Sequence, residues 1–363
     1  MTAPLRAASA IVDQMKQALL DHALPGELDG FGGAEQDEAA AFVASVAGKR
    51  KPGELAIRLE STGGEAGRRR MRLALINDDM PFLVDSVAAA IGAKCLTIHR
   101  LLHPIVHVTR DDGGDLLDAK GGTAESIIYI ELDRADARGR QDLLAELTDV
   151  LSDVRAAVVD WRDMTARMEA DATAIATSDS EGAALLHWLA QNNFTLLGHA
   201  VVANDATVRE GLGILRRSLN LWDDSATLAA IDELVSKRRS LLLLKADRIS
   251  PVHRRVPLDV VMVACPDGTL SIHTGLWTSA ALRAPAEEVP ILRQRLTALD
   301  RELGFAPSSH AGKALAHAIS TLPHDLLISL DPAEVREAAT TAMSLADRPR
   351  PTLLLLPLSL IHI

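Results

Sequence analysis

Aromatic residues, cysteines, long apolar runs and basic charge are all scarce in this chain of 363 residues. Phe, Trp and Tyr make up 3% of the sequence, although 48% is hydrophobic, so its cores must consist mainly of aliphatic side chains. The net charge of −11 argues against a nucleic-acid-binding protein, which is usually basic. No apolar run approaches the ~18 residues that a membrane-spanning helix needs, and residues 1–20 lack the continuous apolar segment of a signal peptide.

The two cysteines, Cys95 and Cys265, lie far apart in the sequence and form no Cys-x-x-Cys motif. This usage predicts reduced core residues, as is usual in a cytoplasmic protein. Together these absences predict a cytoplasmic protein that binds neither nucleic acid nor a membrane.

The chain length suggests two or three domains. We predict an α+β protein made of four parts, which are an N-terminal helical segment over 1–53, a small α+β domain over 54–165, a second α+β region with helical segments over 166–348, and the start of a further domain over 349–363. The last part is apolar and reads as an opening strand. We therefore expect the chain to be truncated there, with residues 359–363 derived from sequencing-adapter read-through.

The small α+β domain is predicted from changes in hydrophobic period. Met71–Ile76 reads as a strand, and a helix follows, with Asp78 or Asp79 as its cap and Pro81 in its first turn. The further elements are an extended segment over 95–108, a strand over 126–132 and an amphipathic helix over 138–158. This order matches a split β-α-β sandwich, except that no closing strand is evident.

The second α+β region shows similar alternation. Strands are predicted over 194–202, 241–245, 258–264 and 270–276, and helices over 182–191, 289–303 and 310–321. Asp331, Pro332 and Glu334 stand as N-cap, first and third positions of a last helix, which is close to a capping box.

Several segments resemble the N-terminal region of the large bacterial NAD-specific glutamate dehydrogenases. They are Asn77-Asp-Asp-Met-Pro-Phe-Leu-Val-Asp-Ser-Val87, His103-Pro104, Ser126-Ile-Ile-Tyr-Ile-Glu-Leu132, Val159-Asp-Trp-Arg-Asp-Met164, Leu186-His-Trp-Leu189, Asn193-Phe-Thr-Leu-Leu-Gly198, Lys245-Ala246, Val252-His-Arg254 and Ser308-Ser-His-Ala-Gly-Lys-Ala-Leu315. The resemblance covers roughly residues 10–356. Its specificity comes from the order and spacing of these segments.

The resemblance implies a regulatory, ACT-containing portion that precedes a catalytic core. The parent enzyme would convert L-glutamate, NAD and water to 2-oxoglutarate, ammonia and NADH. Its partners would be the missing catalytic region and other subunits of a homo-oligomer. The alternatives are a non-catalytic oligomerisation scaffold without a ligand, and a stand-alone amino-acid-binding ACT protein.

The turn from Asn77 to Phe82 is the candidate ligand site. ACT domains often have Asp-x-Pro-Gly-Leu at this turn, and N–H groups at a helix start favour a carboxylate. We therefore predict that Asn77, Asp78, Asp79 and Pro81 lie beside an amino-acid effector. Phe82 stands where ACT domains often have glycine, and a side chain there obstructs the approach of a ligand to the backbone. A packed helix cap without a ligand is the alternative.

No catalytic, cofactor or metal residue is predicted in this chain. Gly30-Phe-Gly32 and Gly211-Leu-Gly213 each lack the third glycine of a dinucleotide fingerprint, so NAD is expected only in the parent enzyme. His99, His103 and His107 alternate onto one face of an extended segment, but residues four apart on one strand are about 13 Å apart. Ligands of one zinc ion lie about 2 Å from it, so these three histidines do not predict a zinc site.

Overall fold

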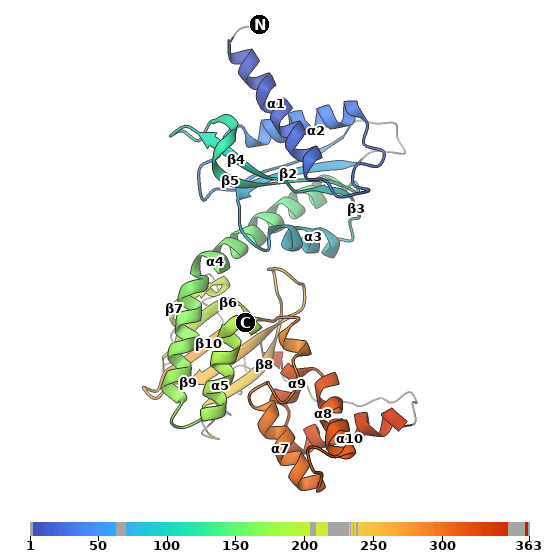
Figure 1. Cartoon of the computed structure of the whole chain (residues 1–363). Helices are drawn as coiled ribbons and strands as arrows, with labels where there is room; N and C mark the ends of the chain where they lie inside the picture. Colours follow the sequence, from blue (N-terminus) through green and yellow to red (C-terminus); the bar gives the residue numbers. More distant parts are fainter. Residues whose placement is uncertain are drawn as a thin grey trace. The chain divides into compact units, whose positions relative to one another are not determined.

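The computed structural model describes residues 3–62, 70–203, 208–216, 239–347 and 360–361, together with residues 232, 234 and 236. The chain divides into two compact units, Met1–Arg155 with Pro251–Arg255 and Ala156–Ser250 with Val256–Ile363. Each unit combines helices with a mainly antiparallel sheet, which confirms the predicted α+β class (Figure 1). Among the described helices, none is both long and apolar enough to cross a membrane.

The predicted domain borders differ from the borders of these two units. The helices over 1–53 and the domain over 54–165 share the first unit, up to residue 155. The part predicted over 349–363 lies outside the described residues, except for 360–361.

The first unit is a sheet between two layers of helices. Its elements are α1 (Ala3–Asp21), α2 (Gly33–Ala47), β1 (Ala56–Ser61), β2 (Met71–Asp78), α3 (Leu83–Ala93), β3 (Ile98–Leu102), β4 (Ile105–Arg110), β5 (Leu116–Leu132) and the first part of α4 (Ala137–Ile175). Helices α1 and α2 lie on one face of the sheet, and α3 with the start of α4 lies on the other (Figure 1). Strand β2 is therefore buried on both faces, and residues 71–77 are all buried or nearly so.

The strand order of the first sheet is β1-β2-β5-β3, and β4 also pairs with β5. In a split β-α-β sandwich, a strand after the second helix would pair with β2 and close the sheet. Strand β1 occupies that position instead, because Ala56 to Ser61 pair antiparallel with Ile76 to Met71. The closing strand therefore precedes the sandwich in the sequence, and the chain after residue 158 continues as helix α4 to Ile175.

The second unit contains the remainder of α4 and a second sheet. Its further elements are α5 (Ser180–Trp188), a π-helical turn (Leu189–Asn193), β6 (Phe194–Val202), β7 (Val208–Gly213), short helical turns at Ile214–Arg216 and Ala281–Arg283, β8 (Leu241–Ile249), β9 (Pro257–Ala264), β10 (Leu270–Trp277), α7 (Leu292–Leu303), α8 (His310–Thr321), α9 (His324–Ser329), α10 (Pro332–Asp347) and β11 (Leu360–Ile361). The strand order is β11-β8-β9-β10-β6-β7.

One apolar core joins the second sheet to its helices. It contains Met164 and Met168 from α4, Leu196 from β6, Val261 from β9 and Leu315 from α8, among others. These strand residues define one face of the sheet, which we call the helix-facing side. The predicted positions of β6, β9, β10 and α8 agree with the structure to within a residue at each end.

The cysteines do not lie where the sequence predicted. Cys95 is exposed and Cys265 is half-buried, so the prediction that both are core residues is wrong. Cys95 follows the last turn of α3, where the backbone adopts a positive φ of 57° and leaves the apolar stripe of that helix. Both cysteines are free thiols.

Candidate functional site

The turn that was predicted to bind a ligand has a different local structure from the one expected. Helix α3 begins at Leu83, its N-cap residue is Phe82, and no side chain caps it. The prediction that Asp78 or Asp79 caps the helix is therefore wrong, and Pro81 precedes the helix. Phe82 adopts the left-handed backbone conformation, with φ 72°. This conformation explains why glycine is favoured at this position in related turns, since a Cβ disfavours it by about 1–2 kcal/mol.

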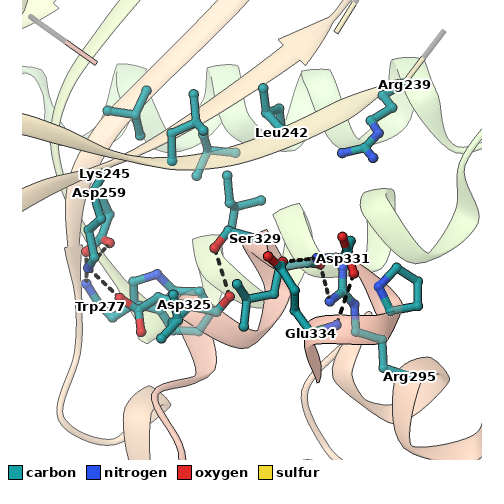
Figure 2. A pocket seen from close by; sticks show the side chains of 17 residues that line it. Arg239, Leu242, Lys245, Asp259, Trp277, Arg295, Asp325, Ser329, Asp331 and Glu334 are labelled. Atoms are coloured by element: carbon teal, nitrogen blue, oxygen red, sulfur yellow. Dashed lines mark hydrogen bonds and ion pairs between the residues drawn. The ribbon is translucent and has the colours of Figure 1, made fainter. Parts of the chain in front are cut away.

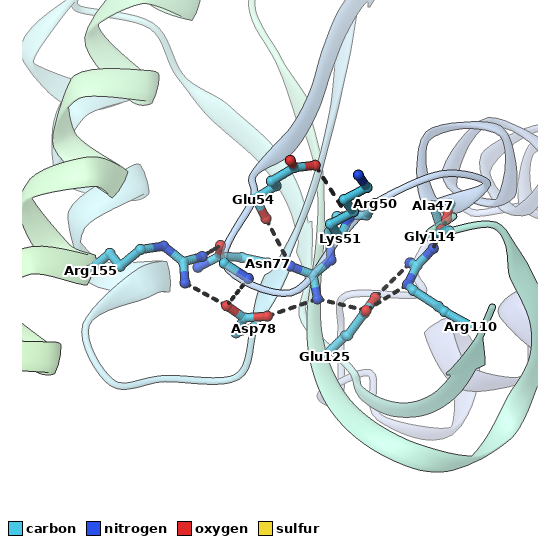
Figure 3. Close-up of polar contacts among 11 residues, drawn as sticks. Ala47, Arg50, Lys51, Glu54, Asn77, Asp78, Arg110, Gly114, Glu125 and Arg155 are labelled. Carbon is cyan, nitrogen blue, oxygen red and sulfur yellow. Dashed lines mark hydrogen bonds and ion pairs between the residues drawn. The ribbon is translucent and has the colours of Figure 1, made fainter. Parts of the chain in front are cut away.

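Asp78 is held by an ion network inside the first unit (Figure 3). One carboxylate oxygen accepts from Arg50 Nη2 at 2.9 Å, and the other accepts from Arg155 Nη1 at 2.5 Å and from the Gly53 N–H at 2.9 Å. Arg155 also donates to the side-chain oxygen of Asn77. Burial alone would raise the pKa of Asp78, but the hydrogen bonds from Arg155 and Arg50 keep it below its usual value.

Glu125 lies at the buried end of the same network and is 1% exposed. It accepts from Arg50 Nη2 at 2.6 Å, and from Arg110 Nε and Nη2 at 2.8 Å each (Figure 3). Burial opposes ionisation of Glu125, yet the hydrogen bonds from Arg110 and Arg50 hold its pKa below the usual value. The network therefore fastens β5 to the loop after α2 and to the end of β4.

The side-chain oxygens of the predicted site thus have partners within the protein, whereas the buried Asn77 Nδ2 has none among the described residues. Asn77 and Asp78 bind Arg155, and Asp79 accepts from the Ser126 hydroxyl at 2.7 Å. The Phe82 ring packs against His253, with 5.2 Å between ring centroids. This geometry resembles the packed-cap alternative, while ligand binding at Asn77, Asp78, Asp79 and Pro81 stays a prediction.

A cavity of about 420 Å³ lies on the helix-facing side of the second sheet (Figure 2). Its volume falls in the range of small-molecule sites. Strands β8 and β9 form one wall, and α9 with the start of α10 forms the other. Polar groups stand at both ends and leucines lie between them. Sequence reasoning missed this site, because its residues come from segments up to about 95 positions apart, from Arg239 to Glu334.

A lysine with two carboxylates forms one end of the cavity. Lys245 Nζ lies 2.5 Å from Asp259 Oδ1 and also pairs with Asp325 (Figure 2). Two aspartates against one lysine leave an excess negative charge in a buried position. Burial accordingly raises the pKa of Asp259 to about 6. The pKa of Lys245 is also raised, since the two carboxylates outweigh the effect of its burial.

Arginine side chains form the other end of the cavity. The Arg295 guanidinium donates to the carbonyl oxygens of Leu327 (2.5 Å), Ile328 (2.9 Å) and Leu330 (2.6 Å), and so caps the C-terminal end of α9. Burial, together with the charge of Arg239, lowers the pKa of Arg295 to about 10.

The predicted capping box of α10 is confirmed, because Asp331 Oδ1 accepts from the Glu334 N–H and the Glu334 carboxylate accepts from the Asp331 N–H.

The raised pKa of Asp259 predicts a gain in stability on mild acidification. Below pH 6 the folded chain holds a proton on Asp259 that the unfolded chain, with an ordinary pKa near 4, does not yet hold. Relative to Asp259→Asn, the wild-type chain should therefore gain about 1 kcal/mol of unfolding free energy between pH 7 and pH 5. Urea unfolding of both chains at each pH measures this difference. A difference that is constant over this range contradicts the prediction.

Neither glycine pair fits a dinucleotide. Gly30 and Gly32 lie between two helices, α1 and α2, and Gly211 and Gly213 lie within the strand β7. A dinucleotide fingerprint requires a turn that leads directly from a strand into a helix. We therefore assign no NAD-binding residue in the described part of the chain.

Among the described residues, one group of side chains could hold a metal ion, and this group differs from the histidines considered in the sequence. Asp171, His199 and His273 offer ligand atoms that lie within 4.8 Å of one another. His99 instead pairs with Asp133 at 2.8 Å, and His103 lies 3.2 Å from the Ser126 hydroxyl. Burial lowers the pKa of His199 to about 3, so its ring is neutral at physiological pH.

Comparison with known families matches two segments of the chain. Residues 16–147 match the family model described as "Glutamate dehydrogenase, ACT1 domain". Residues 289–348 match the model described as "Glutamate dehydrogenase, helical motif 1". The first match covers most of the first unit, and the second covers α7 to α10.

Two curated relatives are similar to the chain over most of its length. The NAD-specific glutamate dehydrogenase of Halomonas elongata is 29% identical over 314 residues, and that of Pseudomonas aeruginosa is 29% identical over 307 residues. Each match covers 76% of this chain and 19% of the relative, so the chain spans about a fifth of the length of these relatives. The resemblance predicted from the sequence is confirmed.

Proposed function

We propose that this chain, which belongs with the large NAD-specific glutamate dehydrogenases, is the regulatory and assembly portion that precedes the catalytic core of such an enzyme. The observation that carries the proposal is the succession of an ACT1 domain and helical motif 1 within a chain that corresponds to 19% of each relative. The parent enzyme would convert L-glutamate, NAD and water to 2-oxoglutarate, ammonia and NADH in the cytoplasm.

The role of this portion would be to contact other subunits of a homo-oligomer and to transmit the binding of an effector to the catalytic core. Such transmission requires that the effector bind two states of the enzyme with different affinity. The packing of Asn77 and Asp78 against Arg155 disfavours a ligand at the predicted turn. The cavity between β8 and α9 is a better place for one.

The charges around this cavity suit a small amino acid. Arg239 is exposed and lines the cavity, where its guanidinium can donate hydrogen bonds to the carboxylate of a ligand. The excess negative charge of Asp259 and Asp325 over Lys245 at the opposite end suits an ammonium group. A zwitterion can therefore pair with charged groups at both ends of the cavity, where Asp331 and Glu334 also line the arginine end, and the leucines between the ends match a short side chain (Figure 2).

Expression of the reading frame that contains this chain tests the parent activity. The complete product should form NADH from NAD and L-glutamate, and this chain alone should not. A complete product that forms no NADH from glutamate overturns the proposal. A reading frame that ends with this chain supports the stand-alone ACT protein instead.

Calorimetric titration of the chain with glutamate, aspartate and arginine tests the regulatory role. We expect saturable binding of at least one of them, weakened at least about tenfold by Arg239→Gln, since a charge-assisted hydrogen bond contributes about 1.5–3 kcal/mol. Arg336→Gln is the matched control, because Arg336 is half-exposed and pairs with Glu302 on the surface of the same unit. Equal binding by Asp79→Asn and the wild type would locate the ligand away from the predicted turn. Absence of binding, with self-association that grows with concentration, supports the scaffold alternative.

A further inference from the structure

A cluster of two buried histidines and a partly buried aspartate lies on the helix-facing side of the second sheet. His199 belongs to β6 and His273 to β10, and they are direct cross-strand partners. Asp171 belongs to the part of α4 that lies in the second unit. Three separate elements thus bring one donor each to the same place.

A β-bulge aims His199 at this place. The pairing of β6 with β10 shifts by one residue between Thr274 and Gly275, so that Leu196 pairs with Gly275 and Gly198 pairs with Thr274. Leu197 is the extra residue. Side chains alternate along a strand, and His199 lies three positions after Leu196. Without the bulge, His199 would therefore point to the opposite face of the sheet from Leu196, away from Asp171. Bulges often reorient side chains in this way next to functional sites.

The donor atoms of the cluster converge around the Asp171 carboxylate. Its Oδ2 atom lies 2.7 Å from His273 Nε2 and 2.5 Å from Ser271 Oγ. Ser271 Oγ in turn lies 2.9 Å from His199 Nε2. The Cys265 thiol donates to the second carboxylate oxygen at 3.7 Å. Side chains that hold a ligating carboxylate in place are typical of protein metal sites.

Both histidine rings are fully buried, and each leaves one nitrogen without a hydrogen bond. Their exposed fraction is 0%. Neither His199 Nδ1 nor His273 Nδ1 has a hydrogen-bond partner among the described residues. Buried polar atoms of native proteins are nearly always paired, and unpaired ones commonly mark a bound water or ion. The Nε2 atom of each ring is the one that faces the Asp171 and Ser271 side chains. Each ring therefore presents one nitrogen to the cluster and keeps a second, buried nitrogen without a partner, which is unusual for a cluster that serves packing alone.

We propose that Asp171, His199 and His273 bind a divalent transition metal ion of the zinc type. Two imidazole nitrogens and a carboxylate oxygen are a donor set that zinc accepts, whereas calcium and magnesium prefer oxygen donors only. Donors that share one zinc ion lie about 3.3 Å apart, given bond lengths near 2.1 Å. The three donor atoms lie within 4.8 Å of one another, close enough for side-chain rotations to bring them to that spacing. The ion would fasten α4 to β6 and β10.

Titration of the untagged, chelator-treated full chain with Co²⁺ tests this site, with visible absorption of the bound ion as the signal and Zn²⁺ as competitor. We expect one Co²⁺ per chain, displaced by one Zn²⁺, and a higher melting temperature in the presence of Zn²⁺. Asp171→Asn and His273→Gln should each weaken binding at least about tenfold, because loss of a ligand should cost at least as much as the roughly 10–100-fold loss caused by mutation of an outer-shell partner.

His317→Gln is the matched control, because His317 is exposed on α8 of the same unit and should bind Co²⁺ like the wild type. Equal binding by the control and by His273→Gln overturns the site. The wild-type titration decides the question without any variant, since less than one bound Co²⁺ per chain also overturns it. This result is independent of glutamate dehydrogenase activity.

Discussion

Replacement of Glu125 by alanine is expected to lower the free energy of unfolding of the first unit by about 3 kcal/mol. Removal of one partner from a buried ion pair typically costs about 3–5 kcal/mol, because the remaining charge stays buried without compensation. Here two guanidinium groups, of Arg50 and Arg110, lose their shared carboxylate. The lower end of the range applies, since Arg50 keeps Asp78 and Arg110 keeps the carbonyl oxygens of Ala47 and Gly114.

Tyr129 allows this change to be measured in the first unit alone. It is the only tyrosine of the chain, lies on the same strand as Glu125 and is 2% exposed. In a chain labelled with 3-fluorotyrosine, ¹⁹F resonances of the folded and unfolded forms therefore report urea unfolding around β5. Asp37→Ala is the control, because Asp37 pairs with Lys16 at a side-chain exposure of 67% and should change stability by less than about 1 kcal/mol. A Glu125→Ala effect as small as that of the control contradicts the structural role of the network.

Elements with a clear local pattern could be predicted from the sequence. Strand β6 and helix α8 have the predicted bounds, 194–202 and 310–321, because alternation and helical periodicity depend only on which face is buried. The capping box at Asp331 was predictable for the same reason, since it involves residues within one turn of helix.

Features that depend on distant pairing could not be predicted. Strand β1 closes the first sheet from the N-terminal side, and only its pairing with β2 reveals that role. The cluster of His199 and His273 requires two strands 74 positions apart in direct register, together with a bulge at Leu197. No local pattern encodes either fact, which is why the histidines examined in the sequence were those close together in the chain.

The candidate ligand turn shows a third limit. Its residue types were identified correctly as polar and close to a helix start. Their hydrogen-bond partners could not be predicted, because Arg50 and Arg155 approach Asp78 from positions 28 and 77 residues away in the sequence. Carboxylates near a helix N-terminus favour a capping role by local rules, and the two arginines offer stronger, charge-assisted partners.

Replacement of Trp277 by alanine is expected to destabilise the second unit by about 3–5 kcal/mol, the usual cost of deleting a buried aromatic side chain and leaving a cavity. Trp277 is 2% exposed and packs against Trp188 with 5.6 Å between ring centroids. It lies at the end of β10 beside the Lys245 and Asp259 pair and lines the cavity between β8 and α9 (Figure 2). The substitution should therefore also abolish the proposed amino-acid binding there.

Hydrogen-exchange mass spectrometry measures the Trp277→Ala effect strand by strand. Peptides from β9 and β10 should exchange at least about 100-fold faster than in the wild type, which corresponds to about 3 kcal/mol at 1.4 kcal/mol per factor of ten. Trp161→Ala provides a matched control of the same residue type in the same unit. Trp161 is 45% exposed on α4, so its removal should change exchange by less than about tenfold. Similar exchange in the two variants would refute the expected difference between the buried and the exposed tryptophan.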